Sequence, residues 1–297
     1  MDLDLAQLRA LRAAVSEGTF EAAARALHVT PSAISQRLRA LEVTTGRVLL
    51  VRSKPVRPTE SGEVLLRLAR QIELLTDDTV AELGGTGGTD GGDVVVPSLP
   101  IAVNADSLGT WVLPALAPLA DAIAFDLRVD DEGHTAALVR AGDVVAAITT
   151  QPEAVPGCSV TRLGAMRYRP TSSASFARRW FPDGATPEAL AVAPVVVFDR
   201  KDELQHRYLS GRVDGPVRPP THYVPSSADF LDAVRLGLGW GMLPDPQRRP
   251  DDADLVELDP AGAIDVVLHW QQWKLRSRPL DRVAAAITAA AREHLVR

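Results

Sequence analysis

The chain has 297 residues, of which 46% are hydrophobic and 24% are charged, and its formal net charge is −6. This length suits two or three domains that each bury a core, and no run of about eighteen apolar residues is present, so we expect no membrane span. The N-terminal stretch MDLDLAQLRA lacks the features of a secretory signal, and the single Cys158 and six scattered histidines show no disulfide or metal-ligand spacing. We expect a cytoplasmic protein without a cofactor, a metal site or a membrane partner.

Positive charge is concentrated at the N-terminus. Residues 1–58 contain nine basic residues (Lys or Arg) and five acidic residues (Asp or Glu). Residues 59–83 contain two basic and six acidic residues, and the remainder of the chain contains twenty-one basic and twenty-seven acidic residues. A negative net charge argues against a nucleic-acid partner only when the charge is spread evenly. The basic N-terminal segment is therefore the candidate nucleic-acid interface.

Residues 1–58 follow the pattern of a winged helix-turn-helix domain. A first amphipathic helix is predicted by apolar residues at steps of three and four, namely Leu5, Leu8, Leu11 and Val15. Thr19 is a suitable cap for a second helix over 20–27, and Pro31 opens a third helix that ends at Gly46. The stretches VLLVR and PVRPT then predict two short strands that form a wing.

The third helix has two distinct faces. On a helical wheel Leu38 and Leu41 fall within about 40° of Ile34, and the three residues form the buried face. The opposite face is short and rich in hydrogen-bond donors, which suits the DNA major groove, while basic wing residues suit phosphates. A solvated face on an ordinary helical bundle is the alternative. The predicted DNA contacts are Pro31, Ser32, Ala33, Ser35, Gln36 and Arg39 on the helix, and Arg52, Lys54 and Arg57 on the wing.

A long helix is predicted over 59–83, followed by a flexible linker over 84–93. The helix carries apolar residues at heptad spacing, namely Leu65, Leu68, Ile72 and Leu75. This seam favours a dimer, and packing of the helix on its own domain is the alternative. The linker, GGTGGTDGGD, contains six glycines and lacks the spacing of a dinucleotide-binding loop. Beyond it, strands alternate with helices, which predicts βαβ units around a mostly parallel sheet.

The stretch FEAAARALHVTPSAISQRLRALE, together with PTESG at 58–62, resembles the LysR-type transcriptional regulators. This resemblance implies a winged helix-turn-helix, a dimerising linker helix, and two α/β lobes of periplasmic-binding-protein type. The implied first lobe comprises residues 94–163 and 264–297, and the second comprises residues 164–263. Operator DNA is the implied partner, with self-association as a dimer or tetramer and RNA polymerase as a further candidate partner.

Several later stretches resemble one subgroup of that family, the ArgP/LysG regulators, among them VNADSLGTWVLPAL, VDDEGHT, GAMRYRPTSS, VFDRKDELQ, VPSSADF and HWQQWKLRSRPLD. Members of this subgroup sense basic amino acids and control their export or metabolism. The resemblance therefore implies L-lysine or L-arginine as the effector. A LysR-type regulator with a different small-molecule effector, and a solute-binding protein or enzyme, are the alternatives. No G-x-S-x-G elbow or P-loop is present, so we expect no enzyme activity.

The effector site is expected where strands end and helices begin, because doubly wound lobes bind ligands there. Asp106 or Asp199 could accept the α-ammonium group of an amino acid. A cationic side chain could be accepted by Asp130, Asp131, Glu132 or Asp202. Such acids also occur in solvated turns, and the serines before ADFLDAV also serve as helix caps. The predicted effector contacts are Asn104, Asp106, Ser107, Asp130, Asp131, Thr149, Thr150, Met166, Phe198, Asp199, Ser226 and Ser227.

Overall fold

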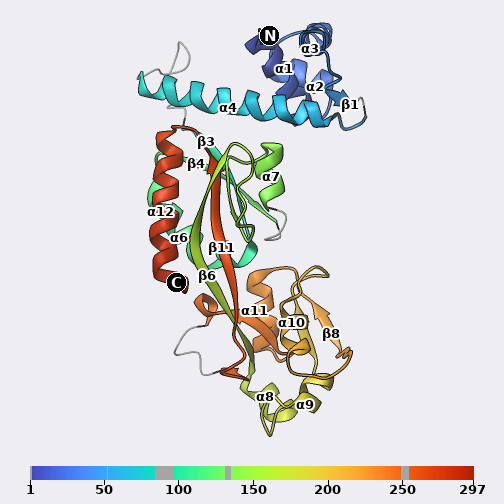
Figure 1. The fold of residues 1–297 in the computed structure, drawn as a ribbon, viewed down its shortest axis with the longest axis vertical. Coiled ribbons are helices and arrows are strands. Elements are labelled where there is room, and N and C mark those ends of the chain that lie inside the picture. Colours follow the sequence, from blue (N-terminus) through green and yellow to red (C-terminus); the bar gives the residue numbers. More distant parts are fainter. Residues whose placement is uncertain (1, 52, 84–95, 131–134, 249–253) are drawn as a thin grey trace.

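The computed structural model describes residues 2–51, 53–83, 96–130, 135–248 and 254–297. A small helical domain and one long helix lie at one end of the molecule, and an α/β domain of two lobes extends away from them (Figure 1). This arrangement confirms the predicted fold class, a winged helix-turn-helix followed by a long helix and two α/β lobes.

The N-terminal domain contains three helices and a two-stranded wing, in the order α1 (Leu5–Ser16), α2 (Phe20–Ala26), α3 (Pro31–Thr45), β1 (Leu50–Val51) and β2 (Arg57–Pro58). The side chains of Thr19 and Thr30 accept the backbone N–H groups that open α2 and α3. Gly46 ends α3 in the left-handed conformation, with φ of 64°. The local signals in the sequence therefore define each helix boundary, and one hydrophobic cluster holds the helices together.

Helix α4 (Glu60–Glu82) packs against this domain along part of the predicted heptad seam. Leu65 is buried in the N-terminal cluster, and Leu68 and Ile72 pack against it. Leu75 is 37% exposed. Packing of the helix on its own domain, the alternative to a dimer seam, therefore accounts for the first three positions, because α1 covers that side of α4.

The α/β domain is built on a seven-stranded sheet with β10-β6-β11-β5-β3-β4 as its main order and β9 paired with β6. The strands are β3 (Ser98–Val103), β4 (Ala124–Val129), β5 (Ala146–Thr149), β6 (Cys158–Ser173), β9 (Gly241–Pro244), β10 (Leu255–Glu257) and β11 (Ile264–Trp273). Among these described strands, β3 pairs in parallel with β4 and β5, and the other pairings are antiparallel. The expectation of a mostly parallel sheet is therefore wrong, because the long strands β6 and β11 cross between the lobes in opposite directions.

Helices cover both lobes of this domain (Figure 1). The first lobe contains α5 (Ala105–Ser107), η1 (Leu108–Val112), α6 (Leu113–Leu116), η2 (Ala117–Leu119), α7 (Thr135–Ala141) and α12 (Arg278–His294). The second contains α8 (Ala174–Trp180), α9 (Pro187–Val192), α10 (Leu204–Ser210), α11 (Ser227–Arg235) and η3 (Asp245–Gln247), with the parallel pair β7 (Val195–Val197) and β8 (Thr221–Tyr223). The expected boundary between 163 and 164 falls inside β6, and the expected return at 264 is the first residue of β11.

Replacement of Gly62 by Ala should destabilise the winged domain. A Cβ atom at this position would overlap the carbonyl oxygen of Leu49, which cannot move freely because it accepts the N–H of Thr59 at 2.9 Å. We expect a loss of about 1–3 kcal/mol in the free energy of unfolding, as for other overpacked sites. Urea unfolding followed by circular dichroism measures this loss. Ser61→Ala, at the preceding position of α4, is the control, and equal stability of the two variants would contradict the prediction.

Candidate functional site

The outer face of α3 presents polar side chains to solvent. Ser32, Ser35, Gln36 and Arg39 are exposed, whereas the opposite face of the helix is buried. The Ser35 hydroxyl donates to the carbonyl oxygen of Pro31 at 3.1 Å, which leaves its oxygen free to accept a further hydrogen bond. Pro31 is also exposed, and Ala33 is half-buried beside the exposed polar residues. The helix therefore offers a shallow surface with several donors, which suits the edges of base pairs.

The wing carries two of the predicted basic contacts on its surface. Lys54 and Arg57 are both exposed, and Arg57 begins β2, which pairs with β1 in antiparallel register. Arg52 lies outside the described residues. At the base of the wing, the hydroxyl of Thr59 donates to the carbonyl oxygen of Val48 at 2.7 Å, which joins the two chain segments that flank the strands. Basic side chains on such a hairpin suit phosphate contacts.

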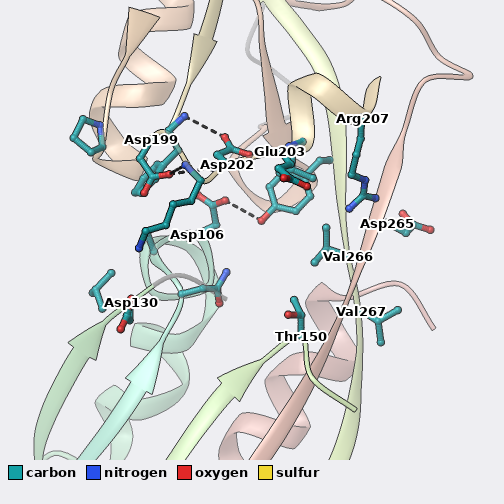
Figure 2. A pocket seen from close by; sticks show the side chains of 18 residues that line it. Asp106, Asp130, Thr150, Asp199, Asp202, Glu203, Arg207, Asp265, Val266 and Val267 are labelled. Atoms are coloured by element: carbon teal, nitrogen blue, oxygen red, sulfur yellow. Dashed lines mark hydrogen bonds between the residues drawn. The ribbon is translucent and has the colours of Figure 1, made fainter. Parts of the chain in front are cut away.

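A pocket of about 770 Å³ lies between the two lobes (Figure 2). The first lobe contributes residues that follow the ends of its parallel strands, and the second contributes the turn between β7 and α10. In Figure 2, Asp130 and Thr150 face Asp199 and Asp202 across this pocket. Of the predicted effector contacts, the pocket is lined by Asn104, Asp106, Asp130, Thr150, Phe198 and Asp199.

Asp106 connects the two lobes through hydrogen bonds to both of its carboxylate oxygens. The hydroxyl of Tyr168 on β6 donates to Oδ2 at 2.8 Å, and the hydroxyl of Ser227 on α11 donates to Oδ1 at 2.7 Å. Ser227 in turn accepts from the amide of Gln247 at 2.6 Å. Burial raises the pKa of Asp106, and the two hydroxyl donors partly oppose this shift because they stabilise the charged form.

The turn after β7 places a second set of carboxylates at the pocket. Asp199 Oδ1 accepts the N–H groups of Lys201 at 2.7 Å and Asp202 at 3.0 Å, which closes the turn. Asp202 accepts the N–H groups of Leu204 and Phe198 at 2.9 and 3.1 Å. Burial raises the pKa of Asp202 despite these donors. Backbone hydrogen bonds therefore hold both carboxylates in defined positions.

Acidic side chains outnumber basic ones around the pocket. Six lining residues are acidic and two are basic, and one of the acids, Asp265, forms an ion pair with Arg167 at 2.7 Å. Low-dielectric walls focus such an excess of negative charge into the space that they enclose. The pocket is therefore suited to a ligand with positive charge. The six acids are Asp106, Asp130, Asp199, Asp202, Glu203 and Asp265, and the two bases are Lys201 and Arg207.

Other predicted effector contacts lie away from the pocket lining. Ser107, Thr149 and Met166 are buried, and Met166 is part of the hydrophobic core. Ser226 is the N-cap of α11, as the capping alternative predicts, and Ser227 contributes its hydroxyl to Asp106. Asp131 and Glu132 lie outside the described residues.

Several pocket residues are not among the contacts predicted from the sequence. Tyr168 is one of them, although its hydroxyl bonds Asp106. Lys201, Glu203 and Arg207 line the pocket from the β7–α10 turn and from α10 itself. The stretch DRKDEL contains a usable signal, because its aspartates favour a tight turn at the carboxyl end of a strand.

Two family models match the chain. Residues 5–63 match the bacterial regulatory helix-turn-helix protein model of the lysR family, and residues 96–295 match the LysR substrate binding domain. The HTH-type transcriptional regulator LysG of Mycobacterium tuberculosis is 43% identical over 290 residues, which cover 97% of this chain and 94% of that protein. The lysine export transcriptional regulatory protein LysG of Corynebacterium glutamicum is 42% identical over 294 residues, which cover 97% of this chain and 98% of that protein.

Two solved structures resemble the whole chain. The crystal structure of ArgP from Mycobacterium tuberculosis has a TM-score of 0.89 at 42% identity and covers 100% of this chain and 99% of its own. Full-length LysG from Corynebacterium glutamicum with bound effector Arg has a TM-score of 0.82 at 40% identity, and the match covers 99% of this chain and 100% of that chain.

These matches define a class of DNA-binding regulator in which a helix-turn-helix precedes a ligand-binding domain. The chain belongs to the LysR family of bacterial transcriptional regulators. Within that family it is a regulator of the ArgP/LysG type, and it is not an enzyme. No described helix is long and apolar enough to cross a membrane. Within the same part of the chain, no group of three or more His, Cys, Asp or Glu is arranged to hold a metal ion.

The raised pKa of Asp106 should make stability depend on pH in the acid range. The unfolded chain has an ordinary aspartate pKa of 3.8, and the folded chain has a higher one, so the folded state binds the proton more tightly between the two values. Stability should therefore fall as pH rises through that window. Asp106→Asn should reduce this fall and leave the part that Asp202 contributes, whereas Tyr168→Phe should widen it because the phenol helps to stabilise the carboxylate. Urea unfolding at several pH values measures the effect, and parallel profiles for all three proteins would refute it.

Proposed function

We propose that this chain binds operator DNA through α3 and the wing and that a basic amino acid in the interlobe pocket controls this binding. The observation that carries the proposal is the acid-rich pocket at the junction of the lobes, in a chain of the ArgP/LysG type. The similar LysG structure from Corynebacterium glutamicum has Arg as its bound effector, and the curated LysG of that organism is a lysine export regulatory protein. Both relatives therefore support a cationic amino acid as the effector of this chain.

The chemistry of the pocket supports this class of ligand. A carboxylate has about four lone-pair sites, so Asp106 can accept an ammonium group in addition to its two hydroxyl donors. Asp130, on the opposite lobe from Asp199, provides a second acceptor for a distant cation. The ligand carboxylate would lie near Thr150 and Asn104, where strands of the first lobe end and their polar side chains face the pocket.

DNA binding is proposed for the exposed face of α3. Ser32, Ser35, Gln36 and Arg39 would contact the major groove, and Lys54 and Arg57 would contact phosphates on either side. We also propose that the regulator acts as a dimer, because operator half-sites are bound by paired recognition helices. Val64, Leu75 and Val80 leave apolar surface exposed on α4 for a second copy.

Calorimetric titration with L-lysine, L-arginine and L-leucine tests the effector assignment. Binding of a basic amino acid is expected, and L-leucine should give no heat. Asp130→Asn should weaken that binding by about 10- to 100-fold, because hydrogen bonds to charged groups contribute about 1.5–3 kcal/mol. Asp126→Asn is the matched control, since Asp126 lies on β4, which ends just before Asp130, but outside the pocket lining. If neither L-lysine nor L-arginine binds to the folded protein, the effector assignment is overturned.

Variants at Gln36 and Lys54 should separate base recognition from general affinity. Gln36→Ala should relax preference among operator sequences, because a bidentate contact to a base contributes about 1–3 kcal/mol of discrimination. Lys54→Ala should weaken binding to all sequences alike and reduce the salt slope by about one. Fluorescence anisotropy with operator and mismatched duplexes at several salt concentrations distinguishes them. If both variants changed sequence preference and salt dependence in the same way, the assignment of base recognition to Gln36 and of phosphate contact to Lys54 would be contradicted.

A further inference from the structure

Helix α4 makes a polar contact with the effector domain at the C-terminal end of α7. Arg70 forms an ion pair with Asp143 at 2.8 Å and donates to the carbonyl oxygen of Ala141 at 3.3 Å. Arg67 donates to the carbonyl oxygen of Arg140 at 3.3 Å. The two guanidinium groups therefore meet the negative end of the helix together with one carboxylate, an arrangement in which each charge favours the contact.

The backbones approach each other closely at this contact. Gly142 has φ of 79°, and a Cβ atom there would lie 3.0 Å from the Cα and Cβ atoms of Arg67. Leu74, one turn beyond Arg70, is buried in the hydrophobic core of the effector domain. Burial lowers the pKa of Arg70, and Asp143 opposes this shift, so the ion pair is partly shielded from solvent. A partly buried pair is held more rigidly than an exposed one, and loss of one partner is costly.

The segment that makes this contact lies in the chain between two pocket-lining residues. Asp130 and Thr150 line the pocket, and the chain between them contains α7, the turn at Gly142 and Asp143, and β5. Figure 1 shows α4 at the amino ends of the strands of the first lobe, with α7 lying beneath it. A shift at Thr150 can therefore reach the contact with α4 through β5 and the turn at Asp143.

We infer that Arg70 and Asp143 are positioning residues that couple effector binding to DNA binding by joining α4 to the turn before β5, the strand that ends at pocket residue Thr150. This inference rests on the proposed function, because it assigns the route by which the same pocket acts on α3. The coupling needs no contact between Asp143 and either the effector or the DNA. It requires only that the α4–α7 contact differs between the two arrangements that the effector selects.

The test measures DNA affinity with and without a saturating basic amino acid, together with effector affinity by calorimetry. Coupling between sites commonly changes affinity by about 5- to 150-fold. Asp143→Asn should reduce the effector-induced change in DNA affinity to less than about half of the wild-type value. It should leave the effector dissociation constant of the DNA-free protein within about twofold, because Asp143 does not line the pocket. Asp143→Glu should retain most of the coupling. Asp232→Asn, which removes a carboxylate paired with an arginine on the second lobe, is the matched control.

The outcomes separate the inference from the proposed function. An unchanged effector response in Asp143→Asn would overturn the inference while the proposed function stands. Failure of the wild-type protein to bind a basic amino acid would overturn both, and calorimetry reports this separately from DNA binding. Where Asp143→Asn does not fold, Arg70→Gln removes the same ion pair from the other side and gives the same test.

Discussion

The antiparallel ladder between β6 and β11 is the constraint on which the arrangement of the effector domain depends. Ten residue pairs join the two strands, from Ile264 and Tyr168 at one end to Trp273 and Cys158 at the other. The strands β5 and β10 extend the same sheet on either side, one in each lobe. The lobes therefore share one backbone framework, and any change in their relative angle must bend these two strands.

A polar bridge across the pocket accompanies this shared framework. The carboxylate of Asp106 joins a tyrosine on the crossing strand to a serine that opens a helix of the second lobe. The bridge uses groups that a cationic ligand would also approach, because they line or border the same space. A ligand bound there, as we propose, would compete with or add to the hydrogen bonds that join the lobes, which is the physical requirement for a ligand to select one arrangement over another.

Helix α4 links the effector domain to the winged domain because it belongs to both hydrophobic cores. Leu65 and Ala69 are buried with the helices of the winged domain, and Leu74 is buried with the effector domain. The ion pair between Arg70 and Asp143 fixes the contact of α4 with the turn after α7, so one helix contacts both domains.

Local signals in the sequence determined the helix boundaries of the winged domain and the strand ends that form the pocket. Thr19 and Gly46 act through neighbours within four residues, and Asp130 and Asp199 follow strands whose ends converge in any doubly wound lobe. Such signals can be detected without knowledge of the path of the chain. The family resemblance of the first eighty residues also needed no structure, and the comparisons confirm it.

Only the tertiary structure decided which distant residues meet. Asp106 accepts hydrogen bonds from Tyr168 and Ser227, which lie 62 and 121 positions farther along the chain. Arg70 donates to the carbonyl oxygen of Ala141, 71 positions away. The heptad seam of α4 had two plausible partners, and the packing of α1 determined which of them covers Leu65. Periodicity states that a face is apolar, but the partner of that face depends on how the whole chain is routed. Within the effector domain, this route depends on the β6–β11 crossing, which no local pattern encodes.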